Sequence, residues 1–161
     1  MRRASDDDLS AAVAACDAGV LEDLAAIFRD VDEQIRRTEA VCLGGGCCCR
    51  FALAGHRLYV TTAELALLLR TRLERSTGVS PMLRVPPLTC PYQRGPACHA
   101  RQHRPLGCRT FFCRTDDRVT HALHEAAHAR IRQLHETANV PYFYNELTAA
   151  IERVREEGCR L

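Results

Sequence analysis

Residues 42–49 read CLGGGCCC, which places four cysteines and three glycines within eight residues. Consecutive glycines disfavour a helix here, because glycine loses more backbone entropy on folding than any other residue. The same freedom lets a loop fold tightly around a bound ion. Thiolates are soft ligands that select zinc, copper(I) or iron–sulfur clusters. The stretch therefore predicts an irregular loop that contributes ligands to a metal.

A second cysteine-rich stretch spans residues 90–113 and contains CPYQRGPAC, RPLGCR and a final Cys113. It is dense in Pro, Gly and Arg and has no clear period, which predicts an irregular loop with one helical turn. A tetrahedral zinc or a cubane cluster needs four ligands, and the two loops together offer eight cysteines. Their spacing matches neither a zinc ribbon nor a bacterial ferredoxin, so it predicts a metal site without naming the metal.

Two other interpretations of the cysteines remain open. Free cysteines are often small buried hydrophobes, which suits Cys16 and Cys159 beside predicted helices. It suits the loop cysteines less well, because few apolar residues neighbour them in the sequence. Disulfides are typical of secreted chains, but residues 1–20 lack the apolar core of a leader, and no apolar run could span a membrane. We therefore expect a cytoplasmic location and reduced thiols.

Long helical patterns flank the two loops. Apolar residues recur at three- and four-residue spacing over 8–37, with Gly19 as a candidate break. The same spacing recurs over 116–137 and predicts a core-facing side formed by Val119, Leu123, Ala126, Ile131 and Leu134.

Shorter elements complete the chain. A capping box starts one of them, because Thr61 and Glu64 have the spacing of reciprocal hydrogen bonds at a helix N-terminus. We expect a strand over 57–61, a helix from that box to near Gly78, a loop over 80–88, and a last helix with Leu147, Ile151 and Val154 on its apolar face, capped by Asn145 and ending at Gly158.

The formal net charge of +2 gives no general indication of a nucleic-acid partner, and the chain has no lysine. Its second cysteine loop is nevertheless rich in arginine. The guanidinium groups either offset thiolate charge or form a solvated basic face. Phosphate or base contacts, with stacking on Phe111 or Phe112, are a third and weaker interpretation. The arginines concerned are Arg94, Arg101, Arg104, Arg109 and Arg114.

A rival motif lies in the predicted helix over 116–137, where residues 124–128 spell HEAAH. In zinc hydrolases both histidines of HExxH bind the metal and the glutamate activates water. Here the longer metzincin pattern fails after His128, and Glu146 or Glu152 would have to supply a third ligand. The histidines of this helix (His121, His124, His128 and His135) share one face. The alternatives are a polar, solvated face or one histidine approaching the cysteine site.

Residues 42–113 resemble the YkgJ-type cysteine-cluster family, described as a zinc- or iron-chelating domain. The first family motif, close to CxxCGxCC, is matched by Cys42, Gly46, Cys48 and Cys49, while Gly45 replaces its second cysteine. Later family motifs, close to CPxL, a further Cys and RPxxCRxF, are matched by Cys90, Pro91, Cys98, Arg104, Pro105, Cys108, Arg109 and Phe111. The resemblance implies a metal-binding domain, in some relatives labelled an iron–sulfur oxidoreductase.

We therefore predict one mainly α-helical domain over 1–161, with a cysteine core at 42–113 between helical segments at 8–37 and 116–157. The predicted metal is zinc or iron, the latter as an ion or a 4Fe–4S cluster, with no membrane partner and an unidentified redox partner if iron is bound. Histidine ligands are less favoured, with His56 ahead of His99 and His103. The predicted ligands are Cys42, Cys48, Cys49, Cys90, Cys98 and Cys108, with Cys47 and Cys113 in reserve.

Overall fold

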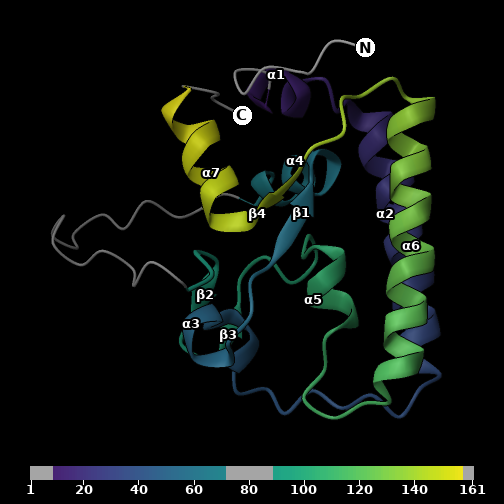
Figure 1. The fold of residues 1–161 in the computed structure, drawn as a ribbon, viewed down its shortest axis with the longest axis vertical. Coiled ribbons are helices and arrows are strands. Elements are labelled where there is room, and N and C mark those ends of the chain that lie inside the picture. Colours follow the sequence, from purple (N-terminus) through teal and green to yellow (C-terminus); the bar gives the residue numbers. More distant parts are fainter. Residues whose placement is uncertain (1–8, 72–88, 158–161) are drawn as a thin grey trace, which may run out of the picture.

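The computed structural model describes residues 9–71 and 89–157. The described chain is mainly helical with little strand, as the sequence predicts. Two long helices stand side by side on one flank, and shorter helices with small strand pairs pack against them (Figure 1). No helix within the described residues has both the length and the apolarity to cross a bilayer.

The helical segment predicted at the N-terminal end forms two helices, α1 (Leu9–Ala14) and α2 (Ala18–Arg36). The break falls at residues 15–17, just before the predicted break at Gly19. Asp17 causes it by accepting a hydrogen bond from the Val20 amide at 2.9 Å, which caps α2. The predicted apolar stripe of α2 is buried throughout: Leu21, Leu24, Ile27, Phe28, Val31 and Ile35.

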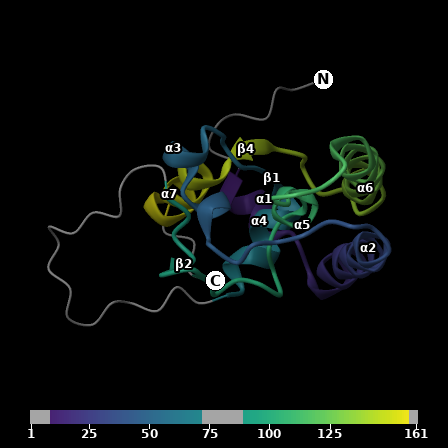
Figure 2. The same ribbon diagram turned by 90° about the horizontal axis from the view of Figure 1, so that it is seen from below.

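Helix α6 (Asp117–Thr137) lies beside α2, as the end-on view in Figure 2 shows. Its length and its start after Asp116 match the prediction. Its buried face matches in part, since Ile131 and Leu134 are buried and Leu123 is partly buried. Val119 and Ala126 are exposed, because α6 contacts α5 as well as α2 and its buried face is turned accordingly. The residues that α6 buries are Thr120, Ala127, Ile131, Leu134 and His135.

A small antiparallel pair links distant parts of the chain. Strand β1 (Tyr59–Thr61) pairs with β4 (Tyr144–Glu146), with Val60 opposite Asn145. Each strand leads directly into a helix: β1 into α4 (Thr62–Leu69) and β4 into α7 (Leu147–Glu156). The pair therefore fixes the starts of two helices against each other.

The predicted capping box of α4 is present. The Glu64 amide donates to the Thr61 hydroxyl at 3.4 Å, and the Thr61 amide donates to the Glu64 carboxylate at 2.8 Å. The helix ends at Leu69, earlier than predicted, while Leu73, Gly78 and the loop predicted over 80–88 lie outside the described residues.

The last helix is close to its prediction. Glu146, not Asn145, caps α7, since its carboxylate accepts the Ala149 amide at 2.9 Å. The predicted apolar face is buried, and the predicted stop at Gly158 lies outside the described residues. The buried residues of this face include Leu147, Ile151 and Val154.

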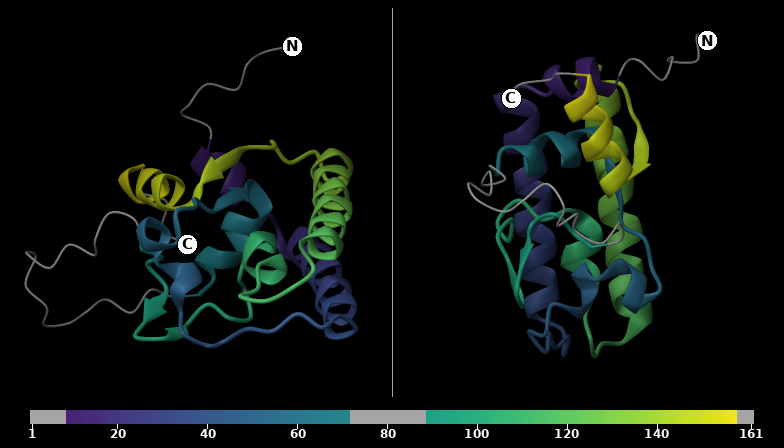
Figure 3. Two further views of the ribbon diagram at one scale, coloured as in Figure 1. Left: turned by 60° about the horizontal axis from the view of Figure 1, so that its bottom comes forward. Right: turned by 90° about the vertical axis from the view of Figure 1, so that its left-hand side faces the viewer.

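The two cysteine loops contain more regular structure than their sequences predict. The first includes a 3-10 turn, η2 (Cys47–Cys49), followed by α3 (Phe51–Ala54). The second contains a hairpin of β2 (Gln93–Arg94) and β3 (Ala97–Cys98), which was not predicted, and the expected helical turn, α5 (Leu106–Thr110). Figure 1 shows α3, β2 and β3 close together at the lower left of the molecule, and Figure 3 gives two further views of the fold.

Candidate metal centre

Backbone hydrogen bonds join the two cysteine loops, although more than 40 residues separate them. The Cys90 amide donates to the Cys49 carbonyl at 2.7 Å. Val41 and Arg114 form a two-way bridge, with N···O distances of 2.8 and 3.2 Å. The loops thus come together, as the sequence predicts.

Gly46 is packed closely between the two loops. Its φ of 66° is in the left-handed region, and its carbonyl accepts a hydrogen bond from the Gln93 side chain at 2.9 Å. A Cβ at this position would lie 2.6 Å from Gln93 Nε2 and 3.0 Å from the Pro96 carbonyl oxygen. Any other residue would therefore be strained by its own backbone and would push the second loop away.

All six predicted ligands belong to one connected group of thiols, hereafter the thiol group. Cys48 and Cys49 interact through their side chains, and the Cys49 thiol is hydrogen-bonded in turn to Cys90. Cys42 acts electrostatically on both Cys48 and Cys49. On the other side, Cys108 interacts with Cys98, Cys49 and Cys48. Three members come from each loop.

Three thiols of this group, those of Cys48, Cys49 and Cys108, have a pKa raised toward the protonated form. Burial, followed by the neighbouring Cys49, raises the pKa of Cys48 to about 11. Hydrogen bonding to Cys90, followed by burial, raises the pKa of Cys49. Burial, followed by Cys49 and Cys98, raises the pKa of Cys108. The crowding of several potential anions makes each one harder to ionise, which a bound cation would reverse.

The thiol group rests on the hydrophobic core, which corrects the expectation that these cysteines have few apolar neighbours. Cys90 is itself a core residue, 8% exposed, and Cys49, Cys98 and Cys108 pack partly buried against the core. Apolar residues distant in sequence, brought in by folding, supply this environment. The remaining members lie nearer the surface, and Cys42 is exposed.

The other cysteines lie apart from this group. Cys47 and Cys113, the predicted reserves, are exposed, and Cys47 Sγ has only a long contact of 4.0 Å to the Gly45 carbonyl. Cys16 is a buried core residue, as the sequence predicts, and its thiol donates to the Ala12 carbonyl at 3.5 Å. Cys159 lies outside the described residues.

The side chains are not arranged as a closed coordination sphere. Across residues 9–71 and 89–157, no three Cys, His, Asp or Glu side chains lie within reach of one metal ion. The donor set is nevertheless chemically uniform, with soft sulfur ligands that suit zinc, copper(I) or iron–sulfur clusters. The arrangement is a collection of neighbouring thiols whose side chains would have to turn inward to bind a metal.

Positive groups adjoin the thiols of the second loop. Burial raises the pKa of Cys98, while the Ala100 amide, Arg104 and Arg101 favour its thiolate. Arg104 also favours the thiolate of Cys108. For these two arginines, the prediction that guanidinium groups offset thiolate charge agrees with their position. Arg94 and Arg114 are exposed, as the solvated alternative predicts.

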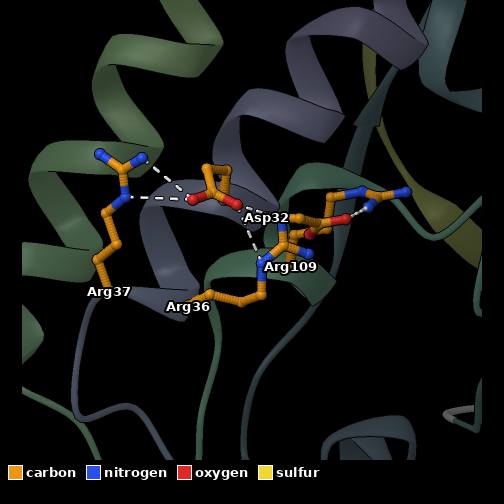
Figure 4. Close-up of polar contacts among 5 residues, drawn as sticks. Asp32, Arg36, Arg37 and Arg109 are labelled. Atoms are coloured by element: carbon orange, nitrogen blue, oxygen red, sulfur yellow. Dashed lines mark hydrogen bonds and ion pairs between the residues drawn. The ribbon is translucent and has the colours of Figure 1, made fainter.

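Arg109 pairs mainly with a carboxylate rather than a thiolate, and it does not belong to a solvated basic face. It is 4% exposed, pairs with Asp32 of α2 (Figure 4), and covers the Phe28 ring at 4.2 Å from the ring centroid. Its remaining donors bind the carbonyls of Arg104 and Gln102 at 2.9 and 2.7 Å. Arg109 therefore fastens the second cysteine loop to α2. Figure 4 shows the same stretch of α2 carrying Arg36 and Arg37, both paired with Glu33.

Glu64 is a further positioning residue, which the sequence identifies only as half of a capping box. Its carboxylate accepts the Leu106 amide at 2.8 Å as well as the Thr61 amide. Leu106 is the first residue of α5, so Glu64 fixes the start of the helix that carries Cys108. Burial raises the pKa of Glu64, although these hydrogen bonds oppose the shift. Sequence offers no signal for a contact between residues 42 positions apart.

The histidines near the loops have other partners. The His56 ring packs between Phe51 and Phe111, with centroids 5.5 and 5.3 Å away. His103 shares a hydrogen bond of 2.7 Å with the Thr71 hydroxyl, and His99 is exposed.

The HExxH residues have hydrogen-bond partners on other elements of the described chain. His124 bonds to the Thr110 hydroxyl at 3.0 Å, and His128 bonds to the Tyr142 hydroxyl at 2.8 Å. Glu125 is exposed and lies 4.0 Å from His121. Of the suggested third ligands, Glu146 is occupied as the cap of α7 and Glu152 is exposed.

His135 lies neither on a solvated face of α6 nor beside the cysteine site. It is 2% exposed, receives the Ala63 amide at 3.4 Å, and lies 3.2 Å from the Val140 carbonyl through Nδ1. It is therefore a core histidine, and burial lowers its pKa.

Comparison of the chain with protein-family models, with curated proteins and with solved structures finds no match.

Proposed function

We propose that this chain binds a metal through the thiol group, as zinc, as an iron ion or as a 4Fe–4S cluster. The observation that carries the proposal is the convergence of six cysteines, three from each loop, over a span of 67 residues (42–108). Four would satisfy a tetrahedral zinc or a cubane. The resemblance of residues 42–113 to the YkgJ-type family points to the same chemistry.

Side-chain rotation is the adjustment that binding requires. Tetrahedral zinc ligands at about 2.3 Å from the metal lie about 3.8 Å from one another, which is near the contact distance of two sulfur atoms. A cysteine thiol turns about its single Cα–Cβ bond, and this rotation does not itself move the backbone. The contacts of Gly46, Glu64 and Arg109 hold that scaffold.

The chain's own groups would favour the thiolates that a metal needs. Arg104 and the Ala100 amide act on the second-loop thiols, as described above. Amide and guanidinium donors to ligand atoms orient them and tune their basicity in known sites. Because the raised pKa values of Cys48, Cys49 and Cys108 favour the protonated thiols, metal binding at these residues would release protons.

The test is metal analysis with a visible spectrum on protein purified without oxygen. Iron with sulfide and broad absorption near ~400 nm would identify a cluster, and colourless protein with stoichiometric zinc would identify a zinc site. Protein that is folded and metal-free after reconstitution with zinc and with iron and sulfide would overturn the proposal.

Matched cysteine variants locate the site. We expect Cys98→Ser and Cys108→Ser to lose the metal, because each removes a member of the thiol group. Cys47→Ser and Cys113→Ser should retain it, since both thiols are exposed and neither is among the thiols that interact with Cys48, Cys49, Cys98 or Cys108. Glu125→Gln should also retain it, which separates a thiolate site from an HExxH site.

A further inference from the structure

A second feature of the molecule is a cleft of about 840 Å³ between α2, the end of α4 and residues 101–104. Ligand pockets commonly have volumes of about 300–1,000 Å³. The cleft lies outside the thiol group, since none of its lining residues is a cysteine. No residue of the HExxH motif lines the cleft either.

The floor of the cleft is apolar. Leu21, Phe28 and Leu67 line it, at 7%, 2% and 8% exposure. Arg109 covers the Phe28 ring, so the aromatic side chain is held in place. Leu21 and Leu67 are the apolar side chains of this floor that an apolar body could contact.

The rim of the cleft is strongly basic. Five arginines line it against two carboxylates, Glu22 and Asp32. Both carboxylates are already paired, Glu22 with Arg29 and Asp32 with Arg109.

The three remaining arginines have spare donors. Among the described residues, neither Arg70 nor Arg101 forms an ion pair with a carboxylate. Arg104 approaches Asp32 only at 3.7 Å, and its Nε has no hydrogen-bond partner in the described chain. Guanidinium groups bind phosphate and carboxylate through parallel hydrogen bonds.

We infer that the cleft binds a small organic phosphate monoester. Arg70 and Arg101 have no carboxylate partner among the described residues, and Arg104 shares Asp32 with Arg109. This excess of positive charge favours a dianionic head group over a singly charged carboxylate, and the apolar floor favours a hydrophobic body beneath it. Arg104 lies at this rim and also acts on the thiols of Cys98 and Cys108. The ligand would therefore lie next to the candidate metal centre, but its binding does not require a metal.

Calorimetric titration of the full chain in a phosphate-free buffer tests the inference with three probes: phenyl phosphate, benzyl alcohol and inorganic phosphate. We expect phenyl phosphate to bind at least about tenfold more tightly than either of the others, since only it satisfies both the rim and the floor. Its affinity should fall with ionic strength, because the arginines that bind it are exposed.

Two cleft variants and a matched control complete the test. Arg70→Gln and Arg101→Gln should each weaken phenyl phosphate binding about tenfold, the usual cost of a lost charge-assisted hydrogen bond. Arg118→Gln, an exposed arginine on α6 away from the cleft, should leave it unchanged. The inference is wrong if benzyl alcohol binds as well as phenyl phosphate, or if both cleft variants bind like the wild type. Neither arginine belongs to the thiol group, so loss of metal in Cys98→Ser is a separate result.

Discussion

The two cysteine loops differ in how they are held. The second loop, residues 90–113, inserts its own side chains into the molecule: Tyr92 is 2% exposed and donates to the Leu68 carbonyl, and Arg109 is buried on α2. The first loop, residues 42–49, buries no side chain in its 3-10 turn and relies on left-handed glycines. Its main anchors are contacts with the second loop.

This difference indicates an order of dependence in the candidate metal centre. The second loop is fastened to the helical core and presents Cys90, Cys98 and Cys108 on a preformed base. The first loop completes the thiol group by docking onto that base. Changes that detach the second loop should therefore disturb all the cysteines of the thiol group. Changes in the first loop should disturb only the cysteines that the first loop contributes.

The largest effect is expected from Arg109→Gln. This substitution leaves Asp32 without its buried partner and removes the donors that hold the Arg104 and Gln102 carbonyls. Breaking such a pair costs about 3 kcal/mol of the free energy of unfolding, measured by urea denaturation. Arg130→Gln is the control, because its pair with Asp30 also joins two helices but is about half exposed, and should cost less than about 1 kcal/mol. Equal losses in the two variants would show that Arg109 does not anchor the loop.

Glu64→Gln should have the next largest effect and lower the free energy of unfolding by about 2 kcal/mol. The amide cannot accept both the Thr61 and Leu106 N–H groups, so one buried donor loses its partner. Alkylation of Cys108 in the metal-free protein should also become faster, since α5 loses its fixed start; peptide mass spectrometry measures this rate. Glu146→Gln is the control, because Glu146 caps α7 at a partly exposed position. It should lower the free energy of unfolding by less and leave the alkylation rate of Cys108 unchanged. An unchanged Cys108 rate in Glu64→Gln would exclude the positioning role.

Gly46→Ala should separate the two loops. A left-handed alanine costs about 1 kcal/mol, and the added Cβ meets Gln93 and the Pro96 backbone. Gly44→Ala is the matched control, because Gly44 has a similar φ of 70° but no atom within 4 Å of the added Cβ. We expect faster alkylation of Cys48 and Cys49 only in Gly46→Ala, with Cys98 unaffected in both. If the two variants behave alike, backbone strain alone governs the first loop.

The smallest effect concerns pH and the buried His135 outside both loops. Burial lowers its pKa, so at mildly acidic pH the unfolded chain binds a proton that the folded protein does not. The stability that neutral His135 contributes is present above the unfolded pKa of about 6.5 and is lost as the pH falls toward the lowered folded pKa. Urea denaturation at several pH values should show a shallower acid-side slope in His135→Gln. His121→Gln, at an exposed position, should keep the wild-type slope, and an unchanged slope in both would contradict the assignment.

Local patterns were predictable because their causes are local. The stripe of α2, the capping box at Thr61 and the face of α7 all follow from residues a few positions apart. The buried face of α6 was predicted in part: Ile131 and Leu134 are buried and Leu123 is partly buried, but Val119 and Ala126 are exposed. Contacts with α5 as well as α2 decide which side faces inward. The hairpin at 93–98 was missed because its strands contain only two residues each.

By itself, the sequence determined that the chain is mainly helical and that its cysteines gather in two glycine- and proline-rich loops. Spacing and residue type suffice for this, since helical periodicity and loop chemistry act over a few residues. Only the tertiary structure decided that Cys49, Cys90, Cys98 and Cys108 come together on the core, that Arg109 and Glu64 hold the second loop, and that an arginine-rimmed cleft opens beside it. Each of these depends on contacts between residues tens of positions apart, whose pairing is selected by packing of the whole core and not by any local pattern.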